Sequence, residues 1–185
     1  MLIVGLGNPS SEYKRTRHNI GFMVIDELIH RQNAQKLSSS SFQGELFKFS
    51  KHFLLKPQTY MNLSGDSIVV VKNFYKIEKV IVIHDDLDLP FGTLRFKHGG
   101  GHGGHNGLKS TDSRISKEYI RIRMGIGRPE HKGEVASYVL SNFSDEELKY
   151  LPEWIAKSCD SIEHLLENSM EDTSSKYSIK KFKLQ

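Results

Sequence analysis

Hydrophobic residues along the chain follow two spacings, one typical of strands and one typical of helices. The run from Leu2 to Leu6 is continuously apolar, as expected for a strand that is buried on both faces. A second run of this kind covers residues 79–84. The sequence predicts further strands at 46–49, 53–56, 93–97 and 119–126.

Helical segments alternate with these strands. After Asn19, a candidate N-cap, apolar residues recur every three or four positions, and the same spacing predicts a helix over 64–75. The last predicted helix has an apolar face formed by Leu148, Leu151, Ile155, Cys159, Ile162 and Leu166. This alternation predicts an α/β domain of three layers, with helices flanking a central twisted sheet that is mixed and largely parallel.

The 185 residues are expected to form a single domain, because this length buries a core without disulfides. Residues 169–185 are polar and lysine-rich, which is typical of a loosely ordered tail. No apolar run is long enough to span a membrane, and the first apolar stretch lacks the features of a signal peptide. The single cysteine, Cys159, fits a reducing compartment, so we expect a cytoplasmic protein without a membrane partner.

The overall charge is only mildly basic, with a net value of +4. An ordinary solvated surface explains it, so the position of the positive charge matters more than the total. Alternate residues of a strand share a face, which places Arg95 beside Lys97 and Arg121 beside Arg123. These faces suit phosphate binding and the protection of an edge strand equally well.

Polar residues follow the predicted strands at four places, and strand ends are where α/β sheets bind ligands. The first place is the turn Gly5–Ser10, with His18 just before the next helix. Its Gly-x-Gly is no dinucleotide fingerprint, because the third glycine is missing and Pro9 interrupts the turn. His18 can exchange a proton near neutral pH, so it is a candidate base, although such a histidine can also simply hydrogen-bond the helix start.

The second place is the acidic end of the strand at 79–84, where Asp85, Asp86 and Asp88 follow His84. These acids suit a divalent cation, which prefers oxygen ligands. Alternatively, one acid orients a histidine and stabilises its protonated form. A solvated turn is the third interpretation.

The third place is the glycine-rich segment 98–107, which contains His98, His102 and His105 and leads into a predicted helix. Such a loop lets the backbone approach a ligand closely, and N–H groups at a helix start bind anions or carbonyl groups. The histidines offer a metal-binding alternative, which no cysteine or helical Glu/His motif supports. At the fourth place, Asn62 either caps a helix or holds a water or a developing oxyanion.

Together, these segments resemble the bacterial peptidyl-tRNA hydrolase family. The matching runs stand in the order of the family, and they are Val4–Pro9, Tyr13, Thr16–Asn19, Lys56–Gly65, His84–Pro90, Gly99–Lys109 and Arg123–Gly127. So many separate matches make a chance resemblance improbable. Ser10 departs from the family, which usually has glycine there; if the position needs a positive φ, serine adds strain and displaces Asn8 slightly.

The resemblance implies a monomeric enzyme that needs no metal or other cofactor and cleaves the ester joining a peptide to the terminal ribose of tRNA. By position, His18 corresponds to the base that activates water, and Asp85 to the acid that orients it. Asn8 corresponds to the residue that distinguishes a peptidyl group from a free amino acid. The remaining substrate residues correspond to Asn62, Asn106, Tyr13 and Tyr60, and the tRNA phosphate patch to Arg95, Lys97 and Arg123.

The chemistry of an ester fits these residues, because a positioned water with one base and a few amide donors suffices. No serine or cysteine stands in a nucleophile elbow, so water is the expected nucleophile. Two alternatives are open. One is a metal-dependent phosphoesterase built on Asp85, Asp86, Asp88 and the histidines of the glycine-rich segment. The other is a non-catalytic RNA-binding module that uses the basic patch.

Overall fold

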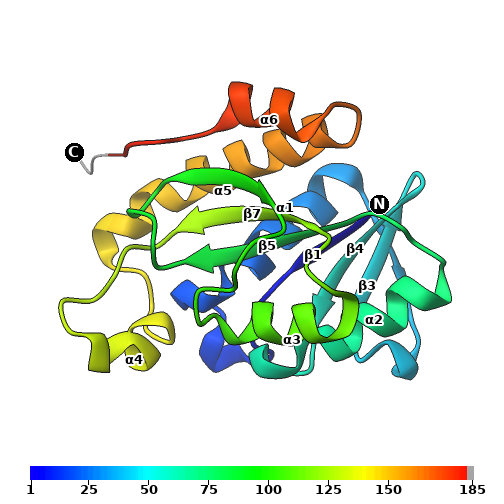
Figure 1. Cartoon of the computed structure of the whole chain (residues 1–185), viewed down its shortest axis with the longest axis horizontal. Coiled ribbons are helices and arrows are strands. Elements are labelled where there is room, and N and C mark those ends of the chain that lie inside the picture. The colour runs from blue at the N-terminus through cyan, green and yellow to red at the C-terminus, as the bar shows by residue number, and fades with distance from the viewer. Residues whose placement is uncertain (183–185) are drawn as a thin grey trace.

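The computed structural model describes residues 1–182, and its centre is a seven-stranded sheet (Figure 1). The strand order is β2-β3-β4-β1-β5-β7-β6. The strands are β1 (Leu2–Gly5), β2 (Gln35–Leu37), β3 (Gly44–Phe49), β4 (His52–Pro57), β5 (Val80–Asp86), β6 (Leu94–His98) and β7 (Ile120–Gly125). All the predicted strands are therefore present, and β2 is an additional one.

The sheet is mixed, as predicted. The four central strands, β4, β1, β5 and β7, run parallel to one another. The pairs β2–β3, β3–β4 and β6–β7 are antiparallel. The parallel part thus occupies the middle of the sheet, where both faces are covered, and the antiparallel pairs lie toward the two edges.

Helices cover both faces of the sheet and complete the three predicted layers (Figure 1). The first face packs against α1 (Ile20–Gln32) and α5 (Asp145–Leu165). The second face packs against α2 (Ser64–Phe74) and α3 (Asn106–Ile115). Side chains of β5 alternate between the two cores, with Ile81 and Ile83 in the first and Val80 and Val82 in the second, because successive residues of a strand point to opposite faces.

The start of α1 lies unusually close to β1. A Cβ atom on Gly5 would stand 2.1 Å from the carbonyl oxygen of Gly21, and one on Gly21 would stand 2.5 Å from the backbone nitrogen of Leu6. Only glycine permits this contact at both positions. It brings the turn before α1, η2 (Arg17–Asn19), against the carboxyl edge of the parallel strands.

Three other turns meet the same edge. The chain leaves β1 through Asn8, leaves β4 through η4 (Met61–Leu63), and leaves β5 directly after Asp86. The carboxyl ends of parallel strands are the usual ligand-binding edge of such sheets. The fold therefore collects the polar segments of the sequence in one region.

The long helix α5 begins at a capping box formed by Ser144 and Glu147, and its apolar face is mostly as predicted. Cys159 is fully buried, and burial raises the pKa of its thiol to about 12, which fits an inert core residue. Leu148, however, was expected to face inward and is 39% exposed. No helix among residues 1–182 is both long and apolar enough to cross a bilayer.

The expectation that α5 is the last helix is wrong, and so is the expectation of a loose tail over most of its length. Residues Met170–Tyr177 form α6, which packs on α5 and β6. Ser169 caps this helix, Thr173 is fully buried, and Ile179 forms an antiparallel bridge with Leu94 of β6. The remainder of the predicted tail, residues 183–185, lies outside the described part of the chain.

Candidate active site

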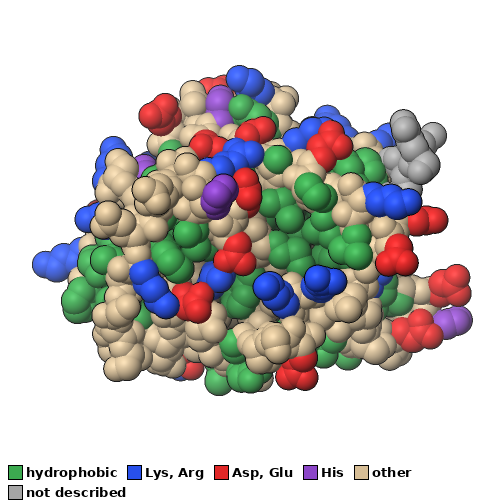
Figure 2. All heavy atoms as spheres, turned by 180° about the vertical axis from the view of Figure 1, so that it is seen from behind, with side chains coloured by type: hydrophobic (Ala, Val, Ile, Leu, Met, Phe, Trp, Pro, Cys, Tyr) green, Lys and Arg blue, Asp and Glu red, His purple; other side chains and the backbone are tan. Residues whose placement is uncertain are grey.

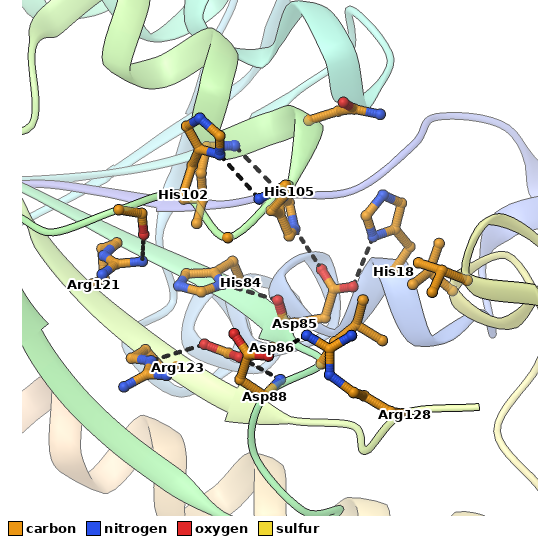
Figure 3. A pocket seen from close by; sticks show the side chains of 18 of the residues that line it. His18, His84, Asp85, Asp86, Asp88, His102, His105, Arg121, Arg123 and Arg128 are labelled. Carbon is orange, nitrogen blue, oxygen red and sulfur yellow. Dashed lines mark hydrogen bonds and ion pairs between the residues drawn. The ribbon is translucent and has the colours of Figure 1, made fainter. Parts of the chain in front are cut away.

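Asp85 connects two histidines at the end of β5. Its carboxylate is 1% exposed, with Oδ2 2.7 Å from Nδ1 of His18 and Oδ1 2.8 Å from Nε2 of His105 (Figure 3). His18 comes from η2, and His105 is the N-cap residue of α3. We call these three side chains the Asp85 cluster. They come from three segments that are distant in the sequence.

The hydrogen bonds of the Asp85 cluster fix where the ring protons lie. His105 Nδ1 accepts from the backbone N–H groups of Gly107 and Leu108, at 3.1 and 3.2 Å, so it carries no proton. The Nε2–H of His105 therefore donates to Asp85. His18 likewise donates its Nδ1–H to Asp85, which leaves a lone pair on its Nε2.

The charge of Asp85 sets the acid–base properties of the cluster. Burial alone would lower the pKa of His18, but the negative charge and hydrogen bond of Asp85 raise it above its usual value of 6.5. Burial alone would raise the pKa of Asp85, but the two histidines hold it well below its ordinary range. The pair therefore consists of an ionised carboxylate and a strengthened base.

A third histidine, His84, lies next to the cluster and stays neutral. Its Nδ1–H donates to the backbone oxygen of Asp85 at 2.9 Å. Burial, and then the proximity of His105, lower the pKa of His84 to about 4. Within residues 1–182, its Nε2 has no hydrogen-bond partner.

The Asp85 cluster borders a cavity of about 630 Å³, a size that suits a ligand. Asn106, at the start of α3, also lines it, as do Lys97 and Arg123 of the predicted basic patch. α4 (Val135–Val139), which contacts η2, contributes an apolar wall formed by Val135, Ala136 and Val139. The lining of the cavity thus combines polar side chains, among them His18, with an apolar wall from α4.

Asn8 lies beside this cavity and not among its lining residues. Its backbone N–H donates to Oδ1 of Asn19 at 2.8 Å, and Nδ2 of Asn19 donates back to the oxygen of Asn8 at 2.9 Å. Asn19 was expected to cap α1, but its side chain makes no capping bond and holds Asn8 instead. Ser10 has φ 83°, so the condition under which serine adds strain is met.

The remaining predicted substrate residues form a second group around η4. The side-chain oxygen of Asn8 accepts from the backbone N–H of Met61 at 2.7 Å, which joins the turn after β1 to η4. Tyr60 is 49% exposed, and its ring meets that of Tyr13 edge to face at 6.4 Å. Asn62 is exposed on η4 and does not cap α2, whose N-cap residue is Leu63. None of Tyr13, Tyr60 and Asn62 lines the main cavity.

The basic residues of β6 and β7 lie side by side, as the alternation predicted. Arg95 is paired with Arg123 and Lys97 with Arg121. We call these four residues the β6–β7 basic face. Figure 2 shows the molecule from behind relative to Figure 1, and on that side basic and acidic side chains are interspersed with hydrophobic ones.

Two side chains of the β6–β7 basic face, those of Arg121 and Arg123, already bond to other parts of the protein. Arg121 is buried and donates to the carbonyl oxygens of Gly99 and Gly101, which fixes the glycine-rich segment over the sheet. Arg123 donates to Oδ2 of Asp86 at 2.8 Å, and this contact lowers the pKa of Asp86 although burial alone would raise it. Lys97 is exposed, and Arg95 borders a separate groove beside α6.

The three acids at the end of β5 do not converge on one point. Asp86 is paired with Arg123 and Asp88 with Arg128 (Figure 3). Within residues 1–182, the side chains with the spacing of metal ligands are His18, Asp85 and His105, whose ligand atoms lie within 4.8 Å of one another. These three side chains already form the two hydrogen bonds of the Asp85 cluster with one another.

Comparison with known proteins shows the family of the chain. The sequence profile of the peptidyl-tRNA hydrolase family matches residues 2–185. The chain belongs to the peptidyl-tRNA hydrolase family. A peptidyl-tRNA hydrolase from Sulfurimonas denitrificans is 73% identical over 185 residues and covers all of both chains. Another from Sulfurovum sp. is 55% identical over 181 residues, which is 97% of this chain and 96% of that protein.

A solved structure supports the fold of this family member. The crystal structure of a peptidyl-tRNA hydrolase from Acinetobacter baumannii superposes with a TM-score of 0.91 at 35% identity. The match covers 97% of this chain and 95% of that one. The likeness therefore extends over the sheet, both helical layers and the cavity.

Sequence reasoning missed two side chains of this peptidyl-tRNA hydrolase site. His105 was considered only as part of a histidine-rich tract, yet its position directly before α3 is one where a side chain can cap a helix. Arg17, next to His18, is buried and bound to Glu147 at 2.8 Å. No local sequence signal distinguishes such an arginine from a surface one.

Proposed function

We propose that the chain hydrolyses the ester between a peptide and the terminal ribose of tRNA, with His18 as the general base. The observation that supports this most directly is the 2.7 Å contact between His18 and Asp85 in a ligand-sized cavity. This contact leaves Nε2 of His18 as the acceptor. Membership of the peptidyl-tRNA hydrolase family supports the identity of the substrate.

In the proposed reaction, Nε2 of His18 takes a proton from a water molecule while the water oxygen bonds to the ester carbonyl carbon. The carbonyl electron pair moves to its oxygen, and Asp85 stabilises the imidazolium that forms. When the tetrahedral intermediate collapses, the bond to the ribose oxygen breaks, and His18 returns the proton to that oxygen. The products are a peptide acid and a tRNA with a free ribose hydroxyl.

The asparagine residues are proposed to bind the reacting groups. Asn106 lines the cavity beside His105, where its amide can hold the water or the developing oxyanion. The side-chain oxygen of Asn8 accepts from the backbone N–H of Met61, and no residue within 1–182 accepts from its NH2 group, which can therefore donate to a peptide carbonyl. A free amino acid has no such carbonyl, so this contact would select peptidyl groups. Tyr13, Tyr60 and Asn62 are proposed to border the same substrate on the η4 side.

The β6–β7 basic face is proposed to bind the tRNA phosphates. Lys97 and Arg123 border the cavity, and Arg95 follows on the same face of β6. Phosphate contacts of this kind position a nucleic acid without reading its sequence. We further propose that the enzyme acts as a monomer, since one chain supplies the whole Asp85 cluster. We also propose that it is cytoplasmic, which its single cysteine supports, and that it needs no metal cofactor, which the family resemblance supports.

The test is hydrolysis of a peptidyl-tRNA by the purified protein in excess chelator, with the His18→Ala variant beside it. We expect full activity with chelator, and a loss of about 10²–10⁴-fold in kcat for His18→Ala, because that is the usual contribution of a general base. His30→Ala, an exposed histidine on α1, is the matched control and should retain its activity. Binding of tRNA should be unchanged in both variants.

Three results would contradict the proposal. Loss of activity in chelator, restored by a divalent cation, would favour the metal-dependent alternative. Binding of tRNA by the wild-type protein without release of peptide would favour the RNA-binding module. Normal turnover by His18→Ala would remove His18 from the role of base. Light scattering of the purified protein tests the monomer directly.

A further inference from the structure

Arg17 has a buried guanidinium that bonds to three segments of the chain. Its Nη2 lies 2.8 Å from Oε1 of Glu147, and its Nη1 donates to Ser141 and, at 2.9 Å, to the backbone oxygen of Asn142. The guanidinium carbon stands 4.3 Å above the centre of the Tyr138 ring. An ion pair, hydrogen bonds and a cation–π contact thus meet at one side chain, directly before His18.

Glu147, the partner of Arg17, also takes part in the start of α5. Its Oε1 also accepts from the backbone N–H of Ser144 at 2.8 Å, as the acidic half of the capping box that begins α5. Arg17 is therefore bound to a carboxylate whose position the helix start fixes. Backbone contacts join the same two segments. The N–H of Arg17 donates to the backbone oxygen of Ser141 at 3.0 Å, and Thr16 forms an antiparallel bridge with Asn142.

Tyr138 extends the contact to the apolar wall of the cavity. It lies on α4, whose residues Val135, Ala136 and Val139 form the apolar side of the cavity that His18 also lines. The hydroxyl of Tyr138 donates to the backbone oxygen of Ile126, just after β7. Five residues are too few for α4 to hold its position by helix formation alone, so these contacts of Tyr138 decide where the wall stands.

We propose that Arg17 is a positioning residue for the reaction, which holds the α4 wall and the turn carrying His18 in one fixed arrangement. This inference rests on the proposed function. A wall fixed at this place confines the water and the ester next to Nε2 of His18. A displaced wall admits additional water and allows the ester to shift, and small displacements of reacting groups are costly.

The competing interpretation is that Arg17 only stabilises the fold. Arg31 supplies a matched control, because this arginine of α1 also binds carboxylates of α5, those of Asp160 and Glu163, at 2.7 Å each. Arg31 does not line the cavity. If Arg17 only stabilises the fold, the Arg17 and Arg31 variants should both lose stability and keep their turnover. If Arg17 is a positioning residue, turnover should fall in the Arg17 variant and stay normal in the Arg31 variant.

The experiment compares Arg17→Met, Arg17→Lys, Tyr138→Leu and Arg31→Met on a saturating peptidyl-tRNA substrate, well below the melting temperature of each variant. We expect kcat to fall about 10-fold or more in Arg17→Met and Tyr138→Leu, with KM within about twofold, because misplacement of reacting groups acts on the chemical step. Arg17→Lys should recover part of kcat, since it keeps the charge opposite Glu147. Arg31→Met should keep a normal kcat whatever its melting temperature.

Equal kcat values in Arg17→Met and Arg31→Met, with similar losses of melting temperature, would overturn the proposal. If Arg17→Met does not fold, Tyr138→Leu decides the question on the same criteria. Hydrogen exchange in residues 135–139 and the NMR titration of the His18 ring give a readout without turnover. Faster exchange and an altered titration in the Tyr138 or Arg17 variant, but not in Arg31→Met, support the positioning role of Arg17 even if the wild-type protein proves inactive on peptidyl-tRNA. The absence of both changes contradicts that role.

Discussion

The Asp85 cluster and the β6–β7 basic face border the same cavity but differ in what holds their charges. The carboxylate of Asp85 is 1% exposed and has a hydrogen-bonding partner on each oxygen. Lys97, in contrast, is exposed, and Arg95 is half-buried beside an open groove. Buried charges act through fixed geometry and are weakly screened, whereas exposed charges act over a distance and weaken with salt. We therefore expect the cluster to determine kcat and its pH dependence, and the basic face to determine KM and its salt dependence.

After the loss of the base itself in His18→Ala, the largest effect within this comparison is expected for Asp85→Asn. We predict a fall of about 10²–10³-fold in kcat/KM, because the amide neither stabilises an imidazolium nor enforces the Nδ1–H tautomer of His18. The negative charge of Asp85 raises the pKa of His18, and the base works only when it is deprotonated. Removing the charge should therefore move the rise of kcat/KM with pH toward lower pH.

The matched control for this prediction is Asp88→Asn. Asp88 is an exposed acid from the same segment, and it pairs with Arg128 and not with a histidine. Its kcat/KM and pH profile should stay close to those of the wild-type enzyme. A pH profile of Asp85→Asn that coincides with the wild-type profile would show that Asp85 does not tune His18.

A smaller effect is expected for His105→Ala. This change removes one of the two donors on Asp85 and the cap of α3, so we predict a loss of about 10-fold in kcat and of about 1 kcal/mol in the free energy of unfolding. His102→Ala is the control. His102 lies in the same segment and accepts from the backbone N–H of Gly104 at 3.0 Å, but it does not bond to Asp85. Steady-state kinetics and urea unfolding measure the two effects. Equal kcat values in the two variants would exclude His105 from a positioning role.

The smallest effect on chemistry is expected at the basic face. In the double variant Arg95→Gln, Lys97→Gln we predict KM to rise about 5- to 10-fold at low salt and kcat to stay within about twofold. The slope of log Kd for tRNA against log salt should flatten by about 0.7–0.9 for each lost phosphate contact. Lys36→Gln, Lys48→Gln removes the same charge from β2 and β3, at the other edge of the sheet, and should leave both quantities unchanged.

The sequence predicted the periodic parts of the molecule and the order of its layers. Continuous apolar runs fixed β1 and β5, and the alternation in β6 and β7 correctly placed the basic residues on one face. It could not predict that Arg121 would be buried against the glycine-rich segment, because that depends on a loop from elsewhere in the chain. The helix α6 was missed because its residues are mostly polar and Thr173 supplies its one buried side chain.

The candidate site was predictable as a list of residues but not as a geometry. Matching to the family selected His18 and Asp85, and the structure brings them into direct contact. Alternation requires Asp85 and Asp86 to face opposite sides of the sheet, but only the packing of both layers decides which one meets the histidine. The second histidine on Asp85 depends on three segments meeting in space, and no local pattern encodes that.

The pairing of Ile179 with Leu94 has a consequence for the whole molecule. β6 is an edge strand of the sheet, and an edge strand offers unpaired backbone groups to other chains. The C-terminal segment bonds to Leu94 in both directions, at 3.0 and 2.9 Å, and so occupies the beginning of that edge. The remaining edge carries the side chains of Arg95 and Lys97, and charged side chains on an edge strand disfavour pairing with another sheet. The same strand therefore carries two features that oppose edge-to-edge pairing with another sheet, a paired beginning and a positively charged remainder.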